Sequence, residues 1–193
     1  MHDYVEGLIC FSFPDNFDVI KYDAKKSKSN KESGFFYCRQ DFNEFACGTC
    51  AVDFIALDTS EDGALWLIEV KDCTNSSQNV VSQYLREDIP KKVRDTFAGL
   101  LAGALTSDLE KERDFMNEAL NKRPIRVVAH IELPDLTKDS KIAKSPKALL
   151  KDYSDMAIKN ISKAVGRENV FLDNTSISHE EVPWKTSRRN SRT

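Results

Sequence analysis

Two carboxylates and a lysine interrupt apolar runs of this sequence. Asp53 lies in the run 50–57 (CAVDFIAL), and Glu69 and Lys71 lie in the run 65–71 (LWLIEVK). An ionised group is costly to bury unless a partner neutralises it, and clusters of such groups tend to mark functional sites. The three residues are therefore candidates for chemistry. Taken singly, each also has an ordinary structural interpretation, as a strand-edge acid or part of a same-face ion pair.

Both runs are predicted to be strands of one β-hairpin. They are rich in branched and aromatic side chains, and the segment 58–64 between them contains an Asp-Gly turn step. A hairpin folded about Glu61 places Asp53 opposite Glu69, with Lys71 further along the same face. Directly opposed carboxylates repel each other, so this register predicts a neutralising cation between them.

A hard divalent cation suits the predicted site. Asp53, Glu69 and the main-chain carbonyl of Val70 offer oxygen ligands, which Mg²⁺ or Mn²⁺ prefers over softer donors. Lys71 would then contact a phosphate or the attacking water.

The spacing of these residues resembles a known nuclease signature. Asp53, followed by Glu69-Val70-Lys71 at the end of the next strand, looks like the D...(D/E)xK pattern of the PD-(D/E)xK nuclease superfamily, without its opening proline. The resemblance implies that Asp53 and Glu69 are catalytic acids that bind Mg²⁺ or Mn²⁺ and that Lys71 assists phosphodiester hydrolysis. It also implies a restriction-endonuclease-like core of αβββαβ order over residues 35–133.

Other site residues implied by the resemblance are less well matched. The leading helix of the superfamily, which often supplies a further acid, is not evident, and Glu6 and Glu44 stand as alternatives for that acid. Some exonuclease branches carry a glutamine and a tyrosine on the helix after the lysine strand. Gln83 and Tyr84 lie on the corresponding predicted helix but off that spacing, so Gln83 is only an accessory candidate.

The remaining polar candidates are basic residues, cysteines and a histidine. Lys91, Lys92 and Arg94 open a predicted helix and are the candidates for binding nucleic acid, although the net charge of −3 is not a basic footprint. Cys47 and Cys50 form a CxxC pair without the second pair that a zinc site needs. His130 lies on a predicted strand, where a lone histidine is usually structural.

The order of elements predicts one α/β domain over residues 1–182, with a mixed central sheet flanked by helices, and a basic C-terminal tail at 183–193. Besides the hairpin, strands are expected at 8–13, 17–22, 35–38, 125–133 and 170–172. Helices are expected at 80–88, from Pro90 to about residue 104, from the capping sequence that starts at Ser107 to about Asn121, and from Pro146 to Val165. The polar segment 24–34 is expected to be a loop.

These features predict a Mg²⁺-dependent nuclease, with DNA as the expected substrate on family frequency and with restriction, repair or anti-phage defence as its setting. No target-recognition domain is evident, so a protein partner is expected to supply specificity. One alternative is a nuclease-like module that binds nucleic acid or protein without cutting. Another is an interaction protein in which the three charged residues form only surface ion pairs.

Composition sets the expected compartment. The 193 residues include no apolar segment long enough to cross a bilayer and no secretory signal. The five cysteines are an odd number at low density, so reduced thiols are expected. The protein is therefore predicted to be cytoplasmic, without membrane partners.

Overall fold

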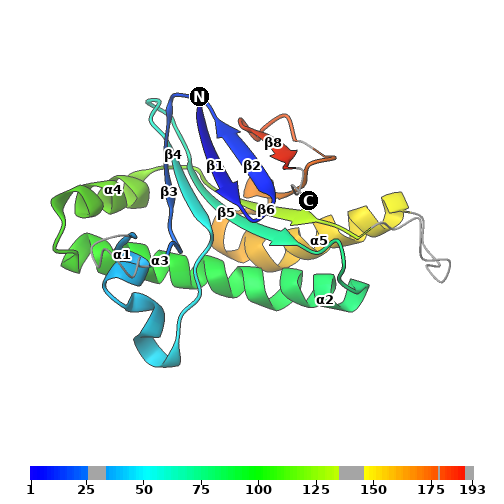
Figure 1. Cartoon of the computed structure of the whole chain (residues 1–193), viewed down its shortest axis with the longest axis horizontal. Helices are drawn as coiled ribbons and strands as arrows, with labels where there is room; N and C mark the ends of the chain where they lie inside the picture. The colour runs from blue at the N-terminus through cyan, green and yellow to red at the C-terminus, as the bar shows by residue number, and fades with distance from the viewer. Residues whose placement is uncertain (26–33, 135–145, 178, 190–193) are drawn as a thin grey trace.

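The computed structural model describes residues 1–25, 34–134, 146–177 and 179–189. Its strands form two sheets, one of five strands and one of three. None of the helices in these ranges is long and apolar enough to span a bilayer. Figure 1 shows the small sheet lying across one side of the large sheet, with the long helices on the opposite side.

The five-stranded sheet is mixed, as predicted, and has the order β3-β4-β5-β6-β7. Its strands are β3 (Phe17–Lys21), β4 (Phe54–Asp58), β5 (Leu65–Asp72), β6 (Ile125–Glu132) and β7 (Val170–Asp173). The pairs β3 with β4 and β4 with β5 are antiparallel, whereas β5 with β6 and β6 with β7 are parallel. Parallel neighbours need a long crossover, and helices supply both of these connections.

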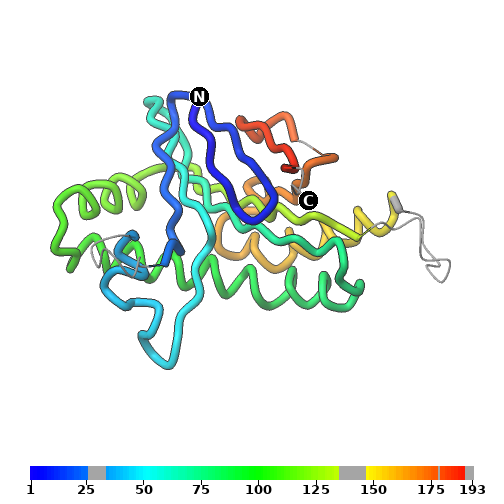
Figure 2. Tube along the Cα trace, viewed as in Figure 1, coloured from blue at the N-terminus to red at the C-terminus, as the bar shows by residue number. Residues whose placement is uncertain are grey.

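The long helices pack against one face of this sheet. The helical segments are α1 (Phe36–Arg39), η1 (Phe42–Cys47), α2 (Gln78–Gln83), η2 (Tyr84–Asp88), α3 (Ile89–Thr106), α4 (Glu110–Asn121), α5 (Pro146–Val165) and η3 (Arg167–Asn169). α2, the π-helical turn η2 and α3 follow one another without a gap, and Pro90 lies in the first turn of α3, as predicted. The tube in Figure 2 shows this continuous helical crossover running beneath the sheet.

Alternation along the strands divides the core into two layers. One apolar cluster joins the helices to the sheet through residues such as Leu65, Leu67, Ala129, Val93 and Tyr153. The other lies between the two sheets and contains Trp66, Ile68, Val128, Phe11 and Trp184. Because neighbouring strand residues point to opposite faces, Glu69 and Lys71 belong to the helix side of β5, with Leu65 and Leu67.

The three-stranded sheet was only partly predicted. It consists of β1 (His2–Glu6), β2 (Ile9–Phe13) and β8 (Lys185–Arg188), with β2 in the centre. Within the predicted basic tail at 183–193, residues 185–188 form β8, which pairs antiparallel with β2. β8 is mostly exposed and polar, so it carries no alternation, and Trp184 just before it is buried. Residues 190–193 lie outside the described ranges.

One predicted strand is a helix. Residues 35–38 were expected to be extended, but Phe36–Arg39 form the single turn α1, in which Phe36 and Tyr37 are buried. A short run of apolar residues has no periodicity that separates a strand from a buried helical turn. Most of the expected loop 24–34 (residues 26–33) lies outside the described ranges.

Candidate active site

β4 and β5 pair in the predicted register, which brings Asp53 and Glu69 to the same end of the hairpin. The pairs are Phe54 with Ile68, Ile55 with Leu67 and Leu57 with Leu65. Asp53 directly precedes this ladder and Glu69 directly follows it. The Val70 N–H donates to Asp53 Oδ2 at 2.6 Å, so the carboxylate takes the place of a ladder acceptor. This bond fixes the Asp53 side chain against β5.

Glu69 is buried beneath the helical crossover. Its side chain is 1% exposed, and its Oε1 atom accepts hydrogen bonds from the Tyr84 hydroxyl and from Lys92 Nζ, the latter at 2.5 Å. The Oε2 atom has no hydrogen-bond partner among the described residues. Side chains from η2 and α3 thus hold the Oε1 atom of this carboxylate, and its Oε2 atom is left for a further ligand.

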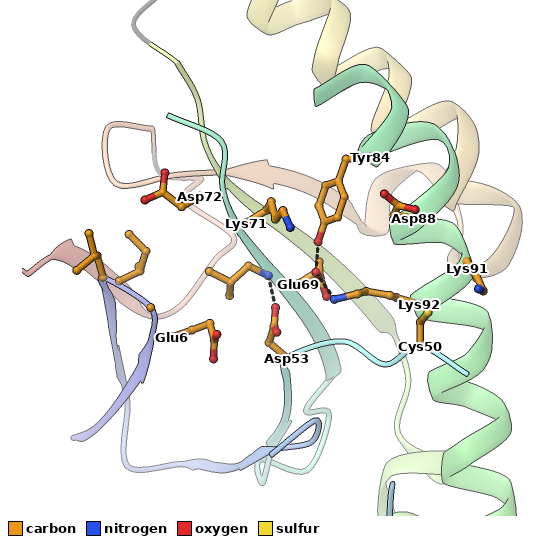
Figure 3. A pocket seen from close by; sticks show the side chains of 14 residues that line it. Glu6, Cys50, Asp53, Glu69, Lys71, Asp72, Tyr84, Asp88, Lys91 and Lys92 are labelled. Carbon is orange, nitrogen blue, oxygen red and sulfur yellow. Dashed lines mark hydrogen bonds and ion pairs between the residues drawn. The ribbon is translucent and has the colours of Figure 1, made fainter. Parts of the chain in front are cut away.

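A cavity of about 600 Å³ contains all three predicted catalytic residues. Asp53, Glu69, Val70 and Lys71 line it, together with Glu6, Tyr84, Lys91 and Lys92 (Figure 3). Lys71 is exposed, and its Nζ lies 5.2 Å from the centre of the Tyr84 ring. At that distance the ammonium group interacts with the aromatic face while remaining open to solvent.

Two further acids join Asp53 in what we call the acidic cluster: Glu6, Asp23 and Asp53. One carboxylate oxygen from each lies within 4.8 Å of the others. Glu6 ends β1 and also forms an ion pair with Lys21. Of the two acids considered as substitutes for a helix-borne one, the structure brings Glu6 to Asp53.

The crowding of negative charge alters the ionisation of these groups. Burial, followed by the nearby charge of Glu69, raises the pKa of Asp53 to about 7. Burial and the charges of Asp53 and Glu6 raise the pKa of Asp23 to about 7 as well. Burial also raises the pKa of Glu69, despite its ion pair with Lys92. Burial alone would lower the pKa of Lys92, but Glu69 and Asp53 raise it. Burial and the neighbouring acids together thus disfavour the ionised forms of Asp53, Asp23 and Glu69.

Three predicted residues do not reach this cavity. The Arg94 side chain is 72% exposed and pairs with Asp95 at 2.7 Å. Glu44 is exposed on η1 and does not line the cavity. The Gln83 amide donates to Glu87 at 3.2 Å on the outside of the crossover. Of the three basic residues predicted to bind nucleic acid, Lys91 and Lys92 line the cavity and Arg94 lies outside it, and Lys92 is already paired with Glu69.

His130 belongs to a separate buried network between the sheets. Its Nδ1 lies 3.2 Å from Asp173 Oδ2 and its Nε2 lies 3.2 Å from Glu132 Oε1. It does not line the active-site cavity. Cys47 and Cys50 are free thiols, of which Cys50 lines the cavity and Cys47 is exposed.

Asp23 and Tyr84 were not predicted as site residues. Asp23 follows β3, which ends at Lys21. Because Lys21 pairs with Phe54, the residues directly after β3 lie beside Asp53. That register could be found only by aligning β3 with β4, since β3 is separated from β4 by a long insertion. Tyr84 was noted as off the expected spacing, yet its hydroxyl reaches Glu69 because η2 continues the helix toward β5.

Among known proteins, the chain is similar to a cysteine–tRNA ligase of Neisseria meningitidis. The two sequences are 30% identical over an alignment of 216 positions, gaps included, which covers 97% of this chain. The chain spans only 30% of the length of that ligase. No established protein-family profile matches the chain, and no solved structure is significantly similar.

Proposed function

We propose that this chain is a metal-dependent nuclease of the PD-(D/E)xK type, which hydrolyses phosphodiester bonds in nucleic acid. The observation that carries the proposal is the meeting of Asp53, Glu69 and Lys71 in one cavity, in the register expected for the signature. Two acids and a lysine at the end of a buried hairpin are costly to bury, so packing alone does not account for them. Carboxylates with raised pKa values that share a cavity with lysines are typical of functional sites.

The fold supports this proposal. The antiparallel strands β3, β4 and β5 are followed by a helical crossover and the parallel strand β6. This order agrees with the βββαβ part of the restriction-endonuclease-like core, but it begins at β3, outside the predicted range 35–133, because residues 36–39 form α1 and not a strand. A leading helix does not precede β3 in the described structure, where the hairpin β1-β2 stands instead and supplies Glu6.

The residues present fit a divalent cation. Asp53, Glu69 and the Val70 carbonyl are the expected ligands, and the acidic cluster adds oxygens from Glu6 and Asp23. The unpartnered Oε2 of buried Glu69 is an acceptor without a donor, as expected of a ligand atom. Bound Mg²⁺ or Mn²⁺ would supply positive charge at the phosphate and lower the pKa of a coordinated water.

The protein groups have separable roles around the substrate. Lys71 faces solvent at the cavity wall, where it can bind a phosphate oxygen or orient the attacking water. Lys91 lines the same wall from α3 and can bind a neighbouring phosphate. Lys92 and Tyr84 hold Glu69 in place from the helix side.

The substrate class has two candidates. DNA is the expectation from the superfamily as a whole. The similarity to a cysteine–tRNA ligase adds tRNA as a substrate or partner, because nearly the whole chain aligns with part of a protein that acts on tRNA. A partner protein supplying specificity and a role in restriction, repair or anti-phage defence remain part of the proposal.

The test is cleavage of linear and circular duplex DNA, single-stranded DNA and tRNA, with Mg²⁺, with Mn²⁺ and with EDTA. Lys71→Ala and Asp53→Asn should each lower the cleavage rate by at least about 100-fold, because each removes a group that acts on the reacting phosphate. Glu44→Gln is the control, since Glu44 is exposed and outside the cavity. Full-rate cleavage by Lys71→Ala, or in EDTA, would disprove the mechanism. Binding without cleavage under all conditions would favour a non-cleaving module.

A further inference from the structure

A second cavity, of about 480 Å³, adjoins the active site. Its walls are formed by Asp23, Lys25, Tyr37, Cys38, Asp41, Asn43, Thr49, Cys50, Ala51 and Lys92. Cys50 and Lys92 line both cavities, and they lie next to each other at one edge of the active site in Figure 3. Asp23 also belongs to the acidic cluster with Asp53. The two cavities therefore meet at the proposed metal ligands.

The walls of the second cavity are built from fixed groups. Tyr37 is 4% exposed, and its hydroxyl donates to the Thr49 carbonyl at 2.7 Å. The Thr49 hydroxyl in turn donates to the Phe42 carbonyl at 2.9 Å. These bonds tie α1 and η1 to the irregular segment 48–52 that leads into Asp53. The cavity thus has a rigid aromatic side close to the reacting centre.

Two residues of this wall, Asp23 and Asn43, each have a buried side-chain oxygen without a hydrogen-bond partner among the described residues. A buried acceptor normally finds a donor, and a ligand bound in the cavity can supply one here. A nucleobase with an amino group is such a ligand, because it can donate an N–H to an amide oxygen such as that of Asn43.

We propose that the second cavity binds one nucleobase of the substrate, a base with an exocyclic amino group, while the adjoining phosphate lies at Asp53, Glu69 and Lys71. This inference rests on the proposed nuclease function and adds a subsite to it. A base can enter such a cavity only when it is unpaired, so single-stranded or looped nucleic acid, or a base extruded from a duplex, is the expected substrate form. Asn43 is then a specificity residue.

The first experiment measures binding of AMP, CMP and UMP to the full chain by NMR titration in Mg²⁺. AMP and CMP should bind the wild type, and Asn43→Ala should weaken their binding roughly 5- to 30-fold, the effect of one lost hydrogen bond to a buried acceptor. UMP offers only a ring N3–H flanked by two carbonyl oxygens in place of an exocyclic amine, so it should bind wild type more weakly than AMP and CMP and change less on Asn43→Ala. Glu44→Ala, next along the chain and exposed, is the matched control.

Asn43→Asp separates recognition from folding. It keeps an acceptor oxygen at the same place, so it should bind AMP more tightly than Asn43→Ala does, whereas a merely structural loss would affect both variants. Equal binding by Asn43→Ala and Glu44→Ala, or no chemical-shift change at Tyr37 and Thr49 on adding AMP, would overturn the inference.

The second experiment uses oligonucleotides with a single unpaired base next to the cleaved bond. Wild type should cut strands with unpaired adenine or cytosine faster than strands with uracil, and Asn43→Ala should lose that preference. Lys71-dependent cleavage without any base preference would refute the subsite and leave the nuclease proposal standing. AMP binding that depends on Asn43, with no cleavage of any nucleic acid, would support the subsite and reject the nuclease.

Discussion

Replacing Lys92 by methionine should destabilise the protein through Glu69. Lys92 Nζ is 2.5 Å from Glu69 Oε1, and the two side chains are 23% and 1% exposed. Methionine keeps the length of the side chain but removes its charge, which leaves a buried carboxylate with only the Tyr84 hydroxyl bonded to it. Breaking one side of a buried ion pair costs about 3–5 kcal/mol.

Lys92 is partly exposed, so solvent screening lowers the expected loss below that range, to about 2–3 kcal/mol. For a chain of this size, that loss lowers Tm by about 5–10 °C. The deficit should grow as the pH rises through the folded-state pKa of Glu69, which burial raises, because only the ionised form of Glu69 needs the partner. At pH values where Glu69 is protonated in both states, the variant should approach wild type.

The assay is thermal unfolding of wild type, Lys92→Met and Lys91→Met with and without Mg²⁺. Lys91 neighbours Lys92 on α3 and is exposed, so its variant makes the same charge change without unpairing Glu69. Adding Mg²⁺ should raise the Tm of Lys92→Met more than that of wild type, since the cation replaces the lost neutralising charge.

Adding Glu69→Gln to Lys92→Met tests the coupling directly. The double variant should recover most of the lost stability, because the buried charge itself is gone. Equal Tm values for Lys92→Met and Lys91→Met, or a double variant no more stable than Lys92→Met, would refute the reasoning.

Three further predictions concern the rest of the fold. Burial alone would lower the pKa of His130, but its carboxylate partners Asp173 and Glu132 raise it. For Glu132, burial would raise the pKa, but hydrogen bonds from His130 and Thr175 lower it to about 2. The pair therefore stabilises the fold most between about pH 4.5 and 6.5, and Tm measured from pH 3 to 9 should fall on both sides more in wild type than in His130→Gln. Trp184→Ala should cost about 3–5 kcal/mol in urea unfolding because the indole is buried between the sheets, whereas exposed Lys185→Ala should cost under about 0.5 kcal/mol. Gly103→Ala should cost about 1–2 kcal/mol by the same measurement, because an added Cβ would lie 2.1 Å from a buried methionine sulfur; an unchanged midpoint would contradict this packing.

The hairpin was predictable because its information is local. Two apolar runs joined by a short turn fix a register, and that register set Asp53 beside Glu69 and Lys71 on the same face of β5. The parallel strands β6 and β7 and the long helices were also predictable, since each carries a clear apolar period.

The remainder of the site depends on contacts between distant segments. Glu6 reaches Asp53 only because the small sheet packs across the large one, and nothing in residues 1–13 specifies that placement. The partner of Lys92 could not be predicted, because a charged side chain on a helix does not identify the residue that it will contact. The sequence therefore led only to the prediction that Lys92 binds nucleic acid. Its pairing with Glu69 requires the path of η2 and α3 across β5, which is set by packing of the whole core.

The acidic cluster gathers one carboxylate from each of three segments: β1, the chain after β3, and the chain before β4. A chain whose small sheet has come away from the large one keeps Asp23 and Asp53 but loses Glu6. Under the proposed function, cation affinity is then a property of the fully assembled fold, and added Mg²⁺ should slow hydrogen exchange in β1 and β2 as well as in β4 and β5. The metal would link the two sheets through its ligands. Separation of the small sheet from the large one would therefore weaken cation binding before the core unfolds.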